Sequence, residues 1–399
     1  MENKNFCIKP FNSVHIGTGG AVETCCMIKP NLSDFKGNTS FNIKQNSIKD
    51  FWTSDYRNYV KEQFVKGNVL KECLLCKRNE KQDIKSERQL ANKNYGIIGN
   101  KNASYYLKHL RKENLAHPED YNLDITNLCN LKCYMCTGSS SSKLLIENNA
   151  LGLETLDQKD FDVSDERLEK LVGEIVENNV TNITLQGGEP LLNPKIISML
   201  ERLSTRDIAK NLSIWITTNA TQYTQKLFDT LSNFKEVKII FSIDGVGKTN
   251  EYLRYPSRWA DIENNVKKFR ILKNATFQIS FTVQSFNLLD IKNIIDFSNE
   301  NKIHLKLNLL YIPRYLRLHV LPKEILQSAL DSINQIEDSA VIHVTNFYEI
   351  KTQIQSALEN PQTSKHALMQ LIGVIGKRDA YRKTSIKNYL PEIAKGLNI

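Results

Sequence analysis

Residues 121–136 read YNLDITNLCNLKCYMC, and this stretch decides the fold that we expect. Its first half alternates apolar and polar residues, which is typical of a β-strand with one buried face. Its second half places Cys129, Cys133 and Cys136 in a C-x3-C-x2-C spacing directly after that strand. Three thiolates this close can hold one [4Fe-4S] cluster and leave one of its irons open to a further ligand. Metal sites with an open position serve catalysis, whereas filled sites serve structure.

Further strand patterns follow, and helical patterns fill the intervals between them. The strand-like segments are 121–126, 182–186, 212–217, 237–243, 277–284 and 304–311. Helical periodicity falls at 165–178, 195–204, 222–232, 259–272 and 288–300. Strands joined by helical crossovers pair in parallel. The sequence therefore predicts an α/β fold whose six units fall short of a closed eight-stranded barrel.

The second strand ends in Gly187-Gly188-Glu189-Pro190. A cysteine triad after the first strand and GGEP after the second resemble the markers of the radical S-adenosylmethionine (SAM) superfamily. The resemblance implies a partial (β/α)6 TIM-like barrel at 119–321, a [4Fe-4S] cluster on the triad, and SAM on the open iron. It also assigns the GGEP backbone to the amino group of SAM, with Glu189 orienting that group or holding the loop.

Other residues near strand ends are further SAM-site candidates, because barrel enzymes place their chemistry at the carboxyl ends of strands. Family position favours Ser242 and Asp244 as partners of the ribose hydroxyls or the carboxylate of SAM. A plain Asp-Gly turn is the alternative there. The residue before the third cysteine is usually aromatic in the family and lies near adenine; here it is Met135, with Tyr134 one place earlier, and both are candidates for that contact.

Four charged residues farther along the chain are also of interest. Arg254 or Arg258 can pair with a carboxylate through two parallel hydrogen bonds, and a solvated arginine is the alternative. Asp379 and Arg382 are three residues apart, which predicts an ordinary pair on a helix surface.

The remaining five cysteines all precede residue 80. Glycines within 17–20 permit a hairpin that would return Cys25 to the vicinity of Cys7. Cys73 and Cys76 have the C-x2-C spacing that brings two thiolates to one metal centre. A four-cysteine zinc site is one alternative, and a redox disulfide between Cys73 and Cys76 is another.

Together with the helix that contains Trp52, these cysteines resemble the SPASM/twitch module of radical SAM proteins. The module usually follows the barrel, whereas here it precedes it. The resemblance implies a second, auxiliary [4Fe-4S] cluster with Cys26 as a neighbour and four ligands: Cys7, Cys25, Cys73 and Cys76. The spacing does not decide whether Cys26 replaces Cys25.

We expect four regions along the chain. A small, cysteine-rich α+β domain at 1–95 is followed by a linker at 96–118, the barrel at 119–321 and a helical extension at 322–399. A capping-box-like start at Ser47 predicts a helix that runs to Gly67.

The composition is that of an ordinary globular protein, with 41% hydrophobic and 24% charged residues among 399. The sequence holds no apolar run of 18 residues and no signal-peptide pattern at its start, so we expect no membrane contact and a cytoplasmic location. Cysteines in a reducing compartment are more often metal ligands than disulfides. The net charge of +9 is a modest surplus for this size.

The resemblance implies an enzyme that reductively cleaves SAM to a 5′-deoxyadenosyl radical and removes hydrogen from a substrate, with the auxiliary cluster assisting an oxidation. A peptide or protein is the favoured substrate; a small molecule such as a sugar or alcohol, and RNA, are alternatives. A scaffold that keeps a cluster without chemistry is the non-enzyme alternative. A flavodoxin- or ferredoxin-like electron donor could dock on a basic stretch, with a solvated face as the alternative: Lys71, Lys77, Arg78, Lys81, Lys85 and Arg88.

Overall fold

The computed structural model describes residues 4–81, 85–97, 103–110, 112, 115–154, 163–359 and 365–399. Within them, nine strands form one open sheet in the order β2-β1-β3-β4-β5-β6-β7-β8-β9. Only the β1–β2 pair is antiparallel. The strands are β1 (Ser13–Ile16), β2 (Val22–Glu23), β3 (Asp120–Leu123), β4 (Asn182–Leu185), β5 (Ser213–Thr218), β6 (Glu236–Ser242), β7 (Ala275–Val283), β8 (His304–Leu309) and β9 (Val344–Thr345).

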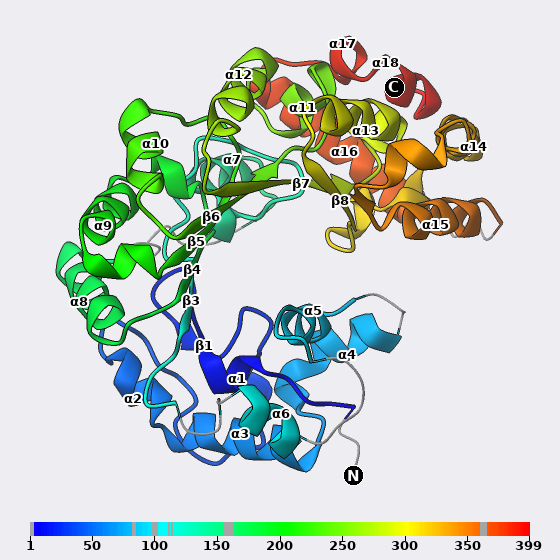
Figure 1. The fold of residues 1–399 in the computed structure, drawn as a ribbon. Helices are drawn as coiled ribbons and strands as arrows, with labels where there is room; N and C mark the ends of the chain where they lie inside the picture. Colours follow the sequence, from blue (N-terminus) through cyan, green and yellow to red (C-terminus); the bar gives the residue numbers. More distant parts are fainter. Residues whose placement is uncertain are drawn as a thin grey trace.

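The six predicted strands correspond to β3 to β8, which are consecutive neighbours in the sheet, and the predicted α/β class is confirmed. Buried apolar residues on these strands alternate with polar residues, so one face of the sheet is apolar and the other polar. Helices cover the outer face (Figure 1). They are α8 (Asp165–Glu177), α9 (Pro194–Ser204), α10 (Gln225–Leu231), α11 (Lys248–Leu253), α12 (Trp259–Phe269) and α13 (Ile291–Glu300). Between β3 and α8, α7 (Ser142–Ala150) follows the cysteine loop.

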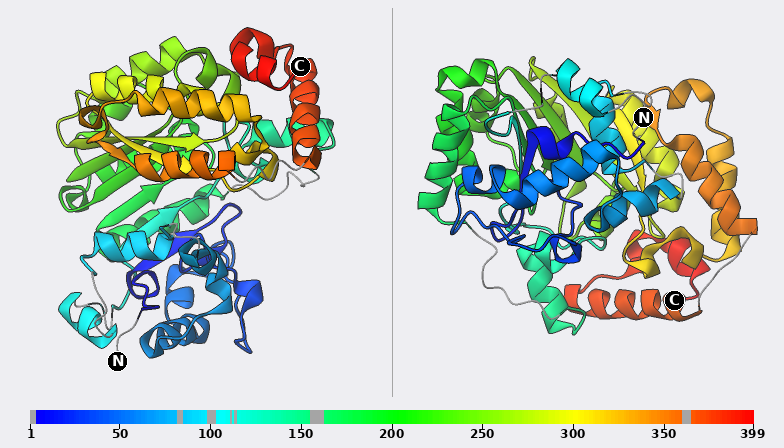
Figure 2. Two further views of the ribbon diagram at one scale, coloured as in Figure 1. Left: turned by 90° about the vertical axis from the view of Figure 1, so that its right-hand side faces the viewer. Right: turned by 90° about the horizontal axis from the view of Figure 1, so that it is seen from below.

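The N-terminal region is tied to the sheet by β1, which pairs in parallel with β3. The predicted hairpin is present: β1 and β2 pair in antiparallel fashion, and Gly19 and Gly20 between them have φ of 83° and 89°. The helix predicted from Ser47 to Gly67 is instead two helices, because Ser54 caps a new one. Figure 2 shows this region as a group of its own beneath the sheet. Its helices are α1 (Lys9–Asn12), α2 (Ile48–Trp52), α3 (Asp55–Lys66), α4 (Leu74–Lys81) and α5 (Glu87–Asn94).

The expected linker at 96–118 contains a helix, α6 (Ala103–Leu110), and some of its other residues lie outside the described ranges. The extension after residue 322 is helical as predicted, but β9 also joins the sheet beside β8. Its helices are α14 (Lys323–Asn334), α15 (Phe347–Glu359), α16 (Lys365–Arg382), α17 (Ile386–Tyr389) and α18 (Pro391–Gly396). Across the described ranges, no helix combines the length and apolar character needed to span a membrane.

Candidate active site

The cysteine triad lies in a loop that begins where β3 ends. Cys129 and Cys133 are buried and Cys136 is half-buried. The backbone of the loop is held from the side of α11, since Lys132 N donates to Tyr255 O at 2.6 Å and Tyr134 N donates to Leu253 O at 3.0 Å. The loop is therefore fixed by main-chain hydrogen bonds rather than by its own turns alone.

Hydrogen-bond donors are aimed at the triad sulfurs. Leu131 N lies 3.5 Å from Cys129 Sγ, Asn219 Nδ2 lies 3.9 Å from the same sulfur, and Arg254 Nη1 lies 3.7 Å from Cys133 Sγ. Donors of this kind stabilise thiolates, the form in which cysteine binds metal, so the residues fit an iron–sulfur cluster.

The GGEP loop packs directly against the cysteine loop. Gly188 N donates to Thr126 O at 2.9 Å and Glu189 N donates to Leu128 O at 2.8 Å. Gly187 has φ of 108°, and a Cβ on Gly188 would lie 2.3 Å from the carbonyl oxygen of Leu128. These glycines therefore allow the GGEP loop to lie close to the backbone of the cysteine loop.

We expect Gly188→Ala to disrupt the site, because the added methyl group would collide with backbone rather than with a mobile side chain. A shift of about 1 Å in the cysteine loop should lower SAM cleavage by about 10²-fold. Gly173→Ala is the matched control, since a Cβ there would meet nothing within 4 Å. Parental cleavage and iron content in Gly188→Ala would contradict this prediction.

Glu189 is fully buried and joins the GGEP loop to the end of β5. Its carboxylate accepts hydrogen bonds from Thr218 Oγ1 at 2.8 Å, Asn219 N at 2.6 Å and Leu191 N at 3.1 Å. Burial raises the pKa of Glu189 to about 7. Pro190 follows it and begins a short 3-10 turn. Asn219, which donates its backbone N–H to Glu189, also has its side-chain amide 3.9 Å from Cys129 Sγ.

Asp244 and Arg254 form a buried ion pair behind the triad. Asp244 Oδ2 lies 2.6 Å from Arg254 Nη2 and 2.7 Å from Nε, and Oδ1 accepts from Thr282 N at 2.6 Å. Both oxygens of Asp244 are therefore engaged within the protein, and the paired Arg254 reaches Cys133. Arg258 is exposed and lies beside Asp261. Ser242 is half-buried at the end of β6.

Tyr134 and Met135 differ in surroundings. Tyr134 is buried, with its hydroxyl 3.0 Å from that of Tyr252 and its ring 4.8 Å from that of Phe286. Arg378 and Arg382 also stack over the Tyr134 ring. Met135 is half-buried beside the triad cysteines. Of the two residues, Met135 has more surface to offer a ligand.

Four of the N-terminal cysteines line one pocket, which we call the four-thiol pocket: Cys7, Cys25, Cys73 and Cys76. Every pair among these thiols interacts electrostatically, so the four are mutual neighbours. Cys26 instead lines a different cavity on the polar face of the sheet, which we call the Lys9 cavity. A hydrogen bond from the Cys26 thiol lowers the pKa of Cys25 to about 6.

The four thiols therefore suit a metal centre in which Cys25, and not Cys26, faces the pocket. In the described ranges, no three side chains of His, Cys, Asp or Glu lie close enough together to hold a single metal ion, and this includes the four thiols of the pocket. The chemistry of the donor set, four clustered thiols, fits a multi-iron cluster and a four-cysteine zinc site alike.

Part of the predicted basic docking stretch is neutralised within the protein. Lys71 pairs with Asp34 at 2.7 Å, while Lys77 and Arg88 both pair with Glu80, at 3.1 and 2.8 Å. Lys77 and Arg88 also line the four-thiol pocket.

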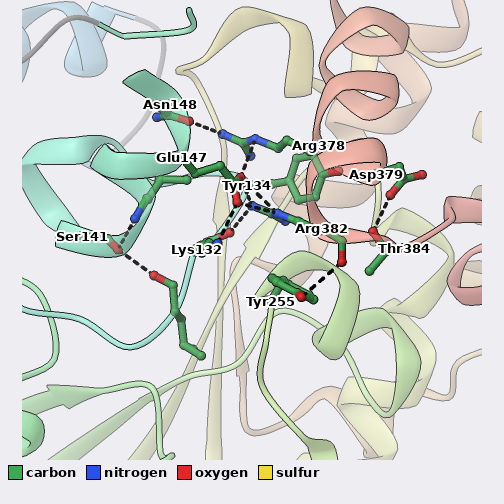
Figure 3. A network of polar contacts seen from close by, with 12 residues as sticks. Lys132, Tyr134, Ser141, Glu147, Asn148, Tyr255, Arg378, Asp379, Arg382 and Thr384 are labelled. Atoms are coloured by element: carbon green, nitrogen blue, oxygen red, sulfur yellow. Dashed lines mark hydrogen bonds and ion pairs between the residues drawn. The ribbon is translucent and has the colours of Figure 1, made fainter. Parts of the chain in front are cut away.

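The structure reveals a contact between Arg382 and the cysteine loop that the sequence did not predict (Figure 3). Arg382, near the end of α16, donates to both oxygens of Glu147 in α7, with Nη2 at 2.6 Å and Nε at 3.0 and 3.1 Å. The same Arg382 Nη2 lies 2.6 Å from the carbonyl oxygen of Lys132, between two triad cysteines. The prediction of a surface pair with Asp379 is wrong: Arg382 is buried, and Asp379 accepts from Thr384 and Ile386 N.

Residues 123–297 match the Radical SAM superfamily, so this part of the chain is similar to a radical SAM domain. The chain is 22% identical over 181 residues to the sporulation killing factor maturation protein SkfB of Bacillus subtilis (strain 168). That match covers 45% of this chain and 39% of SkfB, so the chain spans about two-fifths of that relative's length.

Solved structures with similarity to the chain include anSMEcpe with bound AdoMet, at 20% identity and a TM-score of 0.41 over 53% of this chain and 58% of that one. Another is Streptococcus suis SuiB bound to S-adenosylmethionine, at 16% identity and a TM-score of 0.38 over 84% of this chain and 69% of that one.

Proposed function

We propose that this chain is a radical SAM enzyme whose open parallel sheet is the partial (β/α)6 barrel of that superfamily. Cys129, Cys133 and Cys136 would hold its [4Fe-4S] cluster. The observation that carries the proposal is the set of donors from Leu131, Asn219 and Arg254 that point at the triad sulfurs. When bound there, the reduced cluster supplies the electron that cleaves SAM to methionine and a 5′-deoxyadenosyl radical, which takes hydrogen from the substrate.

The chain's own residues orient and enclose the two reactants. Gly187, Gly188 and Pro190 keep the GGEP backbone against the cluster loop, where it would meet the amino group of SAM. Glu189 anchors that backbone to β5, and Ser242 lies at the end of β6 where it would meet the ribose. The paired oxygens of Asp244 suggest that it acts by holding Arg254 rather than by binding SAM itself.

At the cluster loop, Met135 and Tyr134 differ in what they can contribute. Met135 would contact adenine, because its side chain is only half-buried beside the triad. Tyr134 would support the loop from behind, in the aromatic cluster with Tyr252.

A peptide or protein is the substrate that we propose. The curated relative is named as a maturation protein of the sporulation killing factor, which supports such a substrate for this chain. The cavities on the polar face of the sheet add to this support, since they offer an extended space between the sheet and α5. We infer a cytoplasmic location and a flavodoxin- or ferredoxin-like electron donor, because the thiols need reducing conditions and the cluster needs an electron.

The proposal is tested by anaerobic reconstitution with iron and sulfide, followed by addition of dithionite and SAM without any substrate. We expect 5′-deoxyadenosine and methionine to accumulate. A protein that binds about four irons at the triad yet releases neither product would be the scaffold alternative, and the proposed reaction would be wrong.

We further propose that Cys7, Cys25, Cys73 and Cys76 hold an auxiliary [4Fe-4S] cluster that accepts or relays an electron during substrate oxidation. Each Cys→Ser change among the four should reduce iron from about eight to about four per chain. Cys26→Ser is the matched control and should keep all of the iron, because Cys26 lines another cavity and a serine hydroxyl can still donate to Cys25. About one zinc per chain, with iron for only one cluster, would support the zinc alternative instead.

A further inference from the structure

Two cavities lie side by side on the polar face of the sheet. The Lys9 cavity holds about 670 Å³ and is lined by residues of β1 and β3 to β6. The second holds about 560 Å³ and is lined by residues of β5 to β9; we call it the Lys238 cavity. Both are lined by Trp215 of β5 and by Glu87, Ala91 and Asn94 of α5. The two cavities therefore adjoin between α5 and the sheet.

The Lys238 cavity carries an excess of positive charge. Four lysines line it, Lys85, Lys93, Lys238 and Lys306, against the carboxylates of Glu87 and Glu349. Glu87 is already paired with Lys9, at 2.9 Å. Among the described residues, none of the four lysines has a carboxylate within salt-bridge distance. The cavity thus holds four lysines without an ion-pair partner among the described residues, although the charge of Glu236 acts on Lys238.

Two of these lysines, on strands that flank β7, are held in the cavity by the fold. Lys238 of β6 and Lys306 of β8 are half-buried, and Lys238 Nζ lies 5.1 Å from the centre of the Trp215 ring. Burial and then the charge of Lys306 lower the pKa of Lys238. The same pair of lysines, after burial, lowers the pKa of His304 at the start of β8. Like charges at this spacing repel, and a bound anion would relieve the repulsion.

We propose that the Lys238 cavity binds a side-chain carboxylate of the substrate peptide, so that the enzyme selects a peptide with an acidic segment. This inference rests on the proposed function and names the substrate class for it. A carboxylate suits the site better than a phosphate, since Glu349 in the lining would oppose a doubly charged group more strongly. The amides of Gln278 and Asn308 add hydrogen-bonding capacity in the lining, and Trp215 offers an apolar platform beside it.

The test uses the reconstituted full chain and two fluorescein-labelled peptides of about ten residues. One alternates Glu with Ser and Gly, and the other has Gln in place of every Glu. Fluorescence anisotropy should show that the parent binds the Glu peptide at least about 10-fold more tightly than the Gln peptide. Lys238→Met/Lys306→Met should abolish that preference. Lys273→Met/Lys395→Met is the matched control, with the same change in net charge at two exposed lysines, and it should keep the preference.

Three outcomes would overturn the inference: equal affinities for the two peptides, no binding of the Glu peptide up to about 1 mM, or equal losses in the two lysine pairs. Displacement of the Glu peptide by inorganic phosphate at far lower concentration than by acetate would identify a phosphate site instead. Thermal unfolding and iron content show whether the variants fold. SAM cleavage by the parent reports separately on the proposed function, so acidic-peptide binding without cleavage would overturn that function alone.

Discussion

Replacing Cys129, Cys133 and Cys136 together by alanine should abolish SAM cleavage and leave the rest of the protein folded. Iron should fall from about eight to about four per chain, because the four-thiol pocket keeps its own cluster. The two sites share no ligand, and the triad lies with the GGEP loop while the other four cysteines line a separate pocket. The expected loss of cleavage is complete, since no other cysteine of the chain lies in the triad loop.

The measurement combines iron and sulfide analysis with quantification of 5′-deoxyadenosine after dithionite addition. Cys26→Ser is a suitable control, because it removes one thiol that belongs to neither proposed ligand set. Retained cleavage in the triple variant would contradict the assignment of the triad. Loss of all eight irons would show that the two sites depend on each other, which the separate sets of contacts do not predict.

Local patterns were sufficient to predict the strands and the triad. β3 to β8 each carry enough alternating residues to be recognised, and the cysteine spacing is itself local. The hairpin before Cys25 could be predicted for the same reason, because glycines with positive φ define it. In each of these cases the sequence signal and the structural feature lie within about ten residues of each other.

Features that depend on distant partners could not be predicted. β1 is only four residues long, and its pairing with β3, which lies far along the chain, leaves no mark in the local sequence. Ser54, which splits the helix predicted from Ser47, is the exception, because it caps the second helix through Arg57 N and is a local signal that was missed. Arg382 has a near neighbour of opposite charge, Asp379, and this proximity suggested the wrong partner. Its actual partner lies 235 residues away.

The second prediction with a large expected effect concerns Glu147, the partner of Arg382. Glu147→Ala should destabilise the protein by about 3–5 kcal/mol, because removing one member of a buried charge network leaves the others unpaired. Glu147 is fully buried and is the carboxylate that Arg382, Arg378 and Lys132 approach, at 2.6, 3.6 and 3.3 Å. Three cations would then remain around an empty space beside the cluster loop. The free energy of unfolding, measured with denaturant on the reconstituted protein, is the readout.

A surface carboxylate on α12 provides the control for Glu147→Ala. Glu263→Ala removes one partner of an i,i+4 pair on α12 and should cost no more than about 0.5 kcal/mol. Glu147→Gln keeps the size of the side chain without its charge and should lie between the two. Because Arg382 also binds the carbonyl oxygen of Lys132, Glu147→Ala should loosen the triad and release its iron before that of the four-thiol pocket. A Glu147→Ala protein with parental stability and full iron would show that α16 does not hold the cluster loop in place.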